Sequence, residues 1–203
     1  MATPGELVET VADALRVSEV TVGVYYRNLR EAGLVTKSGR GRSAPSLSYL
    51  DASRLVIALM VSESAIHAAR EARKYGRLPL THLDRPPLDL VYPGLSIERF
   101  SKLNFESAVE YILEIVSASD DEHPISDEMQ PLVISARSDL TAQIRFSLDA
   151  YYDKLPSDWA MAETGAIVSS SRMSHEERMP AGLRVQRFVG GTALVRVARC
   201  VKS

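Results

Sequence analysis

The chain has 203 residues, of which 45% are hydrophobic and 25% are charged, and its formal net charge is −2 at pH 7. It is long enough for one large or two small domains, and apolar enough to bury a core. No apolar run is long enough to cross a membrane, and no basic start followed by an apolar block indicates a signal peptide. We therefore expect a cytoplasmic protein without a membrane partner. Cys200 is the single cysteine, which excludes an internal disulfide.

The first predicted element is a capped helix. In the run Thr3-Pro4-Gly5-Glu6, the Thr3 side chain is placed to accept a bond from the Glu6 amide, and the Glu6 side chain to bond back. The apolar residues that follow share one face at helical spacing. They are Leu7, Val8, Val11, Ala12 and Leu15.

A second helix is predicted after a short turn. Ser18 is a favourable N-cap, and Gly33 lies just past the last turn, where a left-handed residue ends a helix at little cost. Three apolar residues repeat at helical spacing and should face the first helix; they are Val22, Tyr26 and Leu29. The residues expected to point outward are Glu19, Gly23, Val24, Arg27, Asn28 and Arg30, with Thr21 and Tyr25 at the border.

Positive charge is concentrated directly after this helix. Residues 37–42, which we name the basic loop, read Lys-Ser-Gly-Arg-Gly-Arg and follow a strand-like stretch at 35–37. From residue 27 to residue 42 there are five basic residues and one acid, whereas residues 1–26 hold one base and four acids. The basic loop is therefore the part best suited to approach phosphates or a narrow minor groove.

Residues 11–35 resemble the core of winged-helix transcriptional regulators of the arsenic-repressor, multiple-antibiotic-resistance and gluconate-regulator kinds. Arg16 stands where the turn of such proteins usually carries Gly, and Tyr26 where Leu is usual. The matching residues are Ser18, Thr21, Val22, Leu29, Gly33 and Leu34. The resemblance implies a helix-turn-helix with a wing, which places its second helix in the major groove of double-stranded DNA.

Site residues follow from this resemblance and from the charge pattern. Ser18 would hold the helix end at the phosphate backbone. Contacts to base edges, direct or through water, are expected from Thr21, Tyr25 and Asn28. Phosphate and wing contacts are expected from Arg27, Arg30, Lys37, Arg40 and Arg42. One recognition helix reads only a few base pairs, so we expect a homodimer.

The rest of the chain predicts an α+β protein with an N-terminal winged helix-turn-helix domain. That domain would span residues 1–75 and end with a helix from Leu50 to about Tyr75. A proline-rich linker would span 76–95. Residues 96–203 would form a C-terminal domain with a helix and an antiparallel sheet. The helix would be capped by Ser96 or Asn104. Its predicted apolar face is Phe105, Val109, Ile112, Leu113 and Val116.

Strands are expected where the apolar period changes to two. They are predicted at 132–136, 140–148, 165–171, 183–189 and 192–201, the last two joined by a hairpin at Gly190-Gly191. This domain would pair subunits, bind a small-molecule effector or recruit a protein partner. The aromatic cluster of Tyr151, Tyr152 and Trp159 fits a core edge, a subunit interface or an effector pocket.

Enzyme signatures are weak. His175-Glu176 begins like a zinc-protease helix, but Met179 stands where the second His is required. Residues 120–123 have oxygen ligands without the spacing of a calcium loop. We therefore expect no catalytic residue, no metal and no cofactor, and a protein that is not an enzyme.

Three hypotheses remain open from the sequence. The first is a sequence-specific transcriptional regulator that binds DNA as a dimer. The second is a phage or mobile-element DNA-packaging or adaptor protein, with a helix-turn-helix head and a multimerising C-terminal region. The third is a protein-interaction module whose helix pair binds a protein and not DNA.

Overall fold

The computed structural model describes residues 2–37, 46–83, 94–118, 132–137, 140–147, 165–171 and 186–202. The helices are α1 (Pro4–Leu15), α2 (Glu19–Glu31), α3 (Tyr49–Val61), α4 (Ala68–Gly76), α6 (Ile97–Phe100), α7 (Phe105–Ala118) and α8 (Gly191–Lys202), and a 3-10 turn, η1, spans Ala65–His67. The strands are β1 (Leu80–Leu83), β2 (Leu132–Arg137), β3 (Thr141–Ser147), β4 (Gly165–Ser171) and β5 (Gln186–Gly190).

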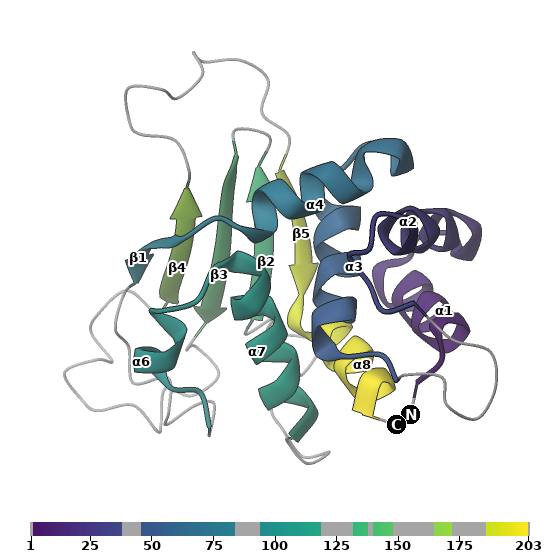
Figure 1. Cartoon of the computed structure of the whole chain (residues 1–203). Helices are drawn as coiled ribbons and strands as arrows, with labels where there is room; N and C mark the ends of the chain where they lie inside the picture. Colours follow the sequence, from purple (N-terminus) through teal and green to yellow (C-terminus); the bar gives the residue numbers. More distant parts are fainter. Residues whose placement is uncertain are drawn as a thin grey trace.

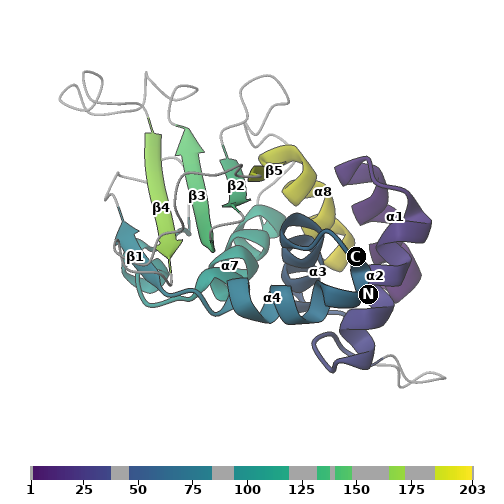
Figure 2. The same ribbon diagram turned by 90° about the horizontal axis from the view of Figure 1, so that it is seen from above.

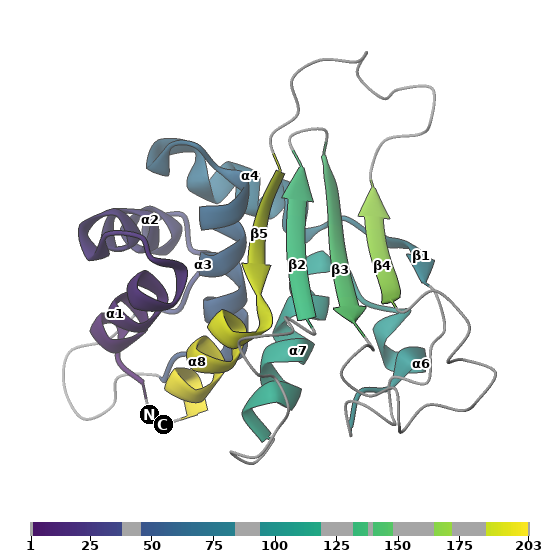
Figure 3. The same cartoon turned by 180° about the vertical axis from the view of Figure 1, so that it is seen from behind.

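The strands pair antiparallel in the order β1-β4-β3-β2-β5. Helices α3, α4 and α7 lie on one side of the sheet (Figures 1 and 2), and Figure 3 shows the strands from the other side. Among the strand residues whose side chains are described, alternate positions of β2 and β3 are buried, as expected when one face packs on helices. They include Ile134 opposite Ile144 and Ala136 opposite Ala142, and Val189 of β5 is buried opposite Ile134.

Local capping fixes the first two helices where the sequence predicts them. The Thr3–Glu6 capping box is formed, with both reciprocal bonds present. The Ser18 side chain accepts from the Thr21 backbone N–H at 3.2 Å. Gly33 has φ +68°, the left-handed conformation expected just after α2. These predictions are confirmed.

Ser96 and Asn104 both act as caps, because the predicted single helix is two helices. The Ser96 hydroxyl accepts from the Arg99 N–H, and Asn104 Oδ1 accepts from the Ser107 N–H at 2.9 Å. The predicted apolar face of α7 is buried in full.

The predicted helix from residue 50 to 75 is wrong, because it is broken after Val61. Ser62 is extended, with φ −105° and ψ 135°. Its carbonyl accepts from the Tyr25 hydroxyl at 3.0 Å and from the Arg187 guanidinium at 3.4 Å. Arg187 also donates to the Met60 carbonyl. Carbonyls freed at the end of α3 are thus satisfied by side chains from distant elements.

The predicted last strand and its hairpin are also wrong. Strand β5 ends at Gly190 and helix α8 begins at Gly191. The segment fits a helix as well as a strand, because its apolar residues also recur at helical spacing. The buried ones are Leu194, Val197, Ala198 and Val201.

Helix α8 packs against α1, so the two ends of the chain lie side by side (Figure 1). Arg196 of α8 forms an ion pair with Asp13 of α1. At its far end, Lys202 Nζ donates to the Ser117 carbonyl at 2.9 Å. Helices α1 and α2 alone cannot enclose a core. Helix α3 packs against α2 and α8 packs against α1, so these two helices cover the remaining apolar surface of the pair.

One cluster of buried side chains runs through the described residues, from α1 to the sheet and α8. The segment predicted as a linker contributes to it. Leu78 and Leu95 are buried, and β1 pairs with β4. The boundaries predicted at residues 75 and 96 therefore do not coincide with a break in packing.

Candidate nucleic-acid interface

Helices α1 and α2 are joined by the short turn 16–18. Arg16 adopts the left-handed conformation (φ 54°, ψ 41°), and its N–H donates to the carbonyls of Ala12 and Asp13. The Val17 N–H donates to the Ala12 carbonyl at 2.9 Å. Helices α1 and α2 are thus joined by a short turn that contains one left-handed residue, and they pack against each other.

We expect Arg16→Gly to raise the free energy of unfolding by about 0.5–1 kcal/mol. Left-handed backbone costs a non-glycine residue ~1–2 kcal/mol, while the extra freedom of unfolded Gly takes back ~0.4–1 kcal/mol. The Arg16 side chain is exposed, so little packing is lost. Urea unfolding measures the change, with Arg16→Ala as the control that keeps the backbone cost. A less stable Gly variant would contradict this description of the turn.

Helix α2 has one buried and one exposed face. Val22, Tyr26 and Leu29 are buried, as predicted. The exposed face carries Val20 and Val24, which are 79% and 40% exposed, followed by Arg27 and Glu31. Thr21 is also exposed, and its hydroxyl lies 2.7 Å from that of Ser18.

Tyr25 does not lie on the exposed face, which corrects the prediction that it contacts bases. It is 7% exposed, and its hydroxyl donates to the Ser62 carbonyl. Asn28 is half-buried, and its Nδ2 donates to the Ala65 carbonyl at 2.8 Å. Both side chains fasten α2 to the segment between α3 and α4. That segment had been predicted as continuous helix, so nothing in the sequence indicated this contact.

Asp51, which the sequence analysis did not single out, holds the base of the basic loop. This carboxylate is 3% exposed. Its Oδ1 accepts from the Thr36 N–H at 2.7 Å, and its Oδ2 accepts from the Thr36 hydroxyl at 2.9 Å. The same Oδ2 accepts from the Ser48 N–H at 2.8 Å and the Ser48 hydroxyl at 3.0 Å. Thr36 and Ser48 flank the segment that contains the loop, so one buried carboxylate ties its two ends together.

The signal for half of this arrangement was present in the sequence. Ser48-x-x-Asp51 is a capping box, here at the start of α3. The bonds from Thr36 add a partner fifteen positions away, which local patterns do not predict. The stretch 35–37 is not a strand in the structure, which corrects the prediction for this side of the loop.

The exit of α2 is fixed by two arginines from other helices. Arg54 of α3 donates to the Leu34 carbonyl at 2.6 Å and forms an ion pair with Glu106 at 3.0 Å. Arg73 of α4 donates to the Ala32 carbonyl at 2.6 Å. The carbonyls of the C-cap residue Ala32 and of Leu34, both just past α2, therefore have charged donors, which are strong partners.

Tyr26 lies in the core beneath α2, and its buried hydroxyl has no hydrogen-bond partner among the residues that the structure describes. Burial raises the pKa of the Tyr26 phenol, the Asp51 carboxylate raises it further, and Arg30 opposes them. The phenol is thus held neutral beneath the exposed face of α2.

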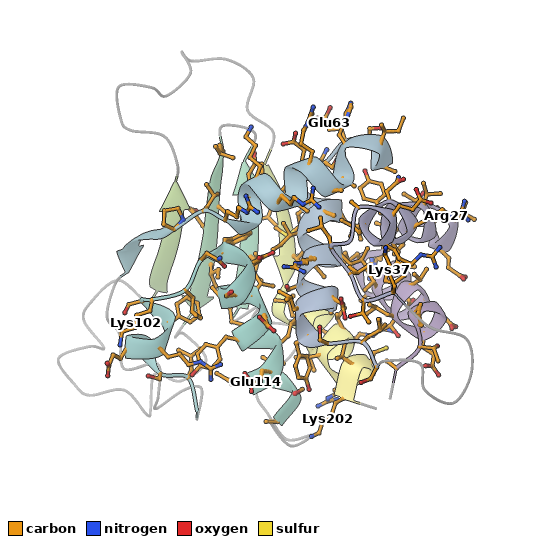
Figure 4. The ribbon with its side chains drawn as sticks, in the orientation of Figure 1. Arg27, Lys37, Glu63, Lys102, Glu114 and Lys202 are labelled. Atoms are coloured by element: carbon orange, nitrogen blue, oxygen red, sulfur yellow. The ribbon has the colours of Figure 1, made fainter. Side chains whose placement is uncertain are left out.

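The predicted phosphate contacts that the structure describes are Arg27, Arg30 and Lys37. Arg27 and Lys37 are exposed and lie at the end of the molecule formed by α1 and α2, whereas Lys102 lies at the opposite end (Figure 4). Arg30 is half-buried in the last turn of α2. Arg40 and Arg42 lie outside the described residues.

Other predicted features also fall outside the described residues. They are the aromatic cluster of Tyr151, Tyr152 and Trp159, the acidic stretch 120–123 and the segment 175–179. Within the described ranges, no group of three or more His, Cys, Asp or Glu residues is placed to hold a metal ion. In the same ranges, no helix combines the length and apolar character needed to cross a bilayer.

Comparison with known proteins found no family model that matches the chain, no similar curated protein and no similar solved structure. The function is therefore inferred from the residues and their geometry.

Proposed function

We propose that this protein is a sequence-specific DNA-binding transcriptional regulator of the winged helix-turn-helix type, acting in the cytoplasm. Helix α2 would enter the major groove, and the basic loop would lie on phosphates or in the adjacent minor groove. The observation that carries the proposal is the Asp51 carboxylate, which ties both ends of the loop-containing segment together next to the exit of α2. A loop held at its base presents its basic residues at lower entropic cost.

The exposed face of α2 revises the residues assigned to base edges. Val20 and Val24 offer methyl groups of the kind that contact the thymine methyl, and Thr21 offers a hydroxyl. Arg27, one turn beyond Val24, is suited to a guanine edge or a phosphate. Tyr25 and Asn28 would instead hold α2 in position, through their bonds to the segment after α3.

A single α2 reads only a few base pairs, so we propose that the protein binds as a homodimer. Residues 96–203 would pair the subunits, bind a small-molecule effector or recruit a protein partner. A palindromic target would follow from two-fold pairing, since the symmetry of the site mirrors that of the dimer.

Removing Arg40 and Arg42 together tests the role of the basic loop. We expect Arg40→Ala/Arg42→Ala to weaken binding to all duplexes and to flatten the salt dependence by about two units, because each phosphate contact contributes about one. Fluorescence anisotropy over a series of salt concentrations measures both. Arg99→Ala/Lys102→Ala is the matched control, because it removes the same charge at α6 and just after it, at the end of the molecule away from α1 and α2 (Figures 1 and 4). A folded double variant with unchanged affinity and salt slope would contradict the role of the loop.

A protein-interaction module is a second candidate, favoured by the exposed apolar residues around α2. Val20 and Val24 lie one turn apart, and Ile66 of the adjacent η1 is 82% exposed. Exposed apolar groups of this size mark protein contacts when they are contiguous. This candidate predicts no salt-sensitive DNA binding by the wild-type protein, which separates it from the regulator.

A further inference from the structure

Helix α4 is amphipathic, with a small apolar face and a cationic face. The buried residues are Ala68, Ala72, Tyr75 and Gly76. The opposite positions, which we name the α4 basic face, are all exposed. They are Arg70, Arg73 and Lys74 of α4 and its C-cap residue Arg77, at spacings of three, one and three, which place them on one side of the helix.

This face has little acidic compensation. Glu71 is the one acid between residues 68 and 77, and it pairs with Arg70 at 2.9 Å. The exposed surface of α1 has the opposite charge, with Glu6, Glu9 and Asp13 exposed. The exposed side of α4 is therefore positively charged, whereas that of α1 is negatively charged.

The α4 basic face meets α2 where that helix leads toward the basic loop. Arg73 donates to the carbonyl of Ala32, the C-cap residue of α2. Helix α4 packs against α2, and η1, which directly precedes α4, accepts the bond from Asn28. Arg73 belongs to the α4 basic face and contacts the end of α2. The other three residues share its side of the helix, so the whole face begins next to α2.

We infer that the α4 basic face is a second phosphate-contacting element, which lies on the backbone of the duplex beside α2. The inference rests on the proposed function. From Arg70 to Arg77 the helix rises by ~10 Å. That length matches the axial rise of about three phosphates of one strand. Arg73 holds α2, while Arg70, Lys74 and Arg77 would supply the contacts.

The test is Lys74→Gln/Arg77→Gln, which leaves Arg73 and its bond to Ala32 in place. Fluorescence anisotropy measures DNA binding over a series of salt concentrations. We expect the slope of log affinity against log salt to flatten by about two units, and the affinity to fall by tens of fold near 0.1 M salt. The loss should be the same for preferred and random duplexes, because phosphates carry no sequence information. Arg99→Gln/Lys102→Gln is the control of equal charge, and Lys74→Arg/Arg77→Lys should keep the wild-type slope.

The outcomes separate the two proposals. If the wild-type protein binds DNA with a salt-dependent affinity and the Lys74→Gln/Arg77→Gln variant matches it in affinity and slope, the inference about α4 is overturned alone. If the wild-type protein shows no salt-sensitive binding at low salt, the proposed function is overturned, and the inference with it. A loss equal in size for the Arg99→Gln/Lys102→Gln control would also overturn the inference, because it would show an effect of net charge only.

Discussion

Replacement of Asp51 by Ala is expected to lower the free energy of unfolding by about 2–4 kcal/mol, because four hydrogen bonds to one buried, charged acceptor are lost together. Four hydrogen bonds from Thr36 and Ser48 end on this carboxylate. The change also removes half of the capping box of α3. Urea unfolding followed by circular dichroism measures the loss.

Asp51→Asn is the control for shape, since it keeps one acceptor oxygen and should lose less stability than Asp51→Ala.

Asp51→Ala should also weaken DNA binding. Under conditions where the Ala variant is folded, we expect weaker DNA binding, because Thr36 and Ser48 no longer share one partner at the base of the loop. An Asp51→Ala variant within about 0.5 kcal/mol of the wild type, the usual range of a neutral surface substitution, would show that the carboxylate does not hold the loop.

Leu29→Ala is expected to cost about 2–5 kcal/mol, the range for a leucine truncated in a packed core. Leu29 is fully buried in α2, and its carbonyl accepts from the Leu34 N–H at 2.9 Å. The cavity would form in the core shared by α1 and α2, so DNA binding should be lost through unfolding of this unit.

Val20→Ala is the matched control on the same helix. Val20 is 79% exposed, so its truncation should change stability by no more than about 0.5 kcal/mol. Thermal and urea unfolding of the two variants, measured side by side, test the assignment of the α2 faces. Equal losses for Leu29→Ala and Val20→Ala would contradict it.

Local signals in the sequence predicted the first two helices well. The bonds of Thr3 and Ser18 are formed within three residues, and Gly33 needs only its own backbone freedom. A contact of this kind depends on neighbours in the chain and not on the fold, so the sequence pattern is sufficient to predict it.

The elements that were predicted wrongly take their structure from contacts with residues far away in the sequence. The segment 192–201 has apolar residues that fit both periods, and packing against α1 and α7 selects the helix. The break after Val61 is stabilised by Tyr25 and Arg187, which are far away in the sequence. Because a single sequence does not show which side chains will reach these carbonyls, the break was missed.

In the candidate site, too, the local features could be predicted from the sequence and the distant contacts could not. The basic loop and the capped α2 follow from composition and local spacing. Helical position predicts Asn28 on the outward face and Tyr25 at its border, but the segment 62–65 covers both side chains. The role of Asp51 depends on Thr36, and that of the α4 basic face depends on Arg73 reaching Ala32.

Selection of bound sequences from random duplex DNA by the wild-type protein, at two salt concentrations, tests the central claim most directly. The proposed regulator predicts enrichment of one palindromic site, with total recovery of DNA falling at the higher salt concentration as phosphate contacts are screened. Random, unenriched sequences together with no salt-sensitive binding at low salt would contradict it, and would assign the exposed face of α2 to a protein partner.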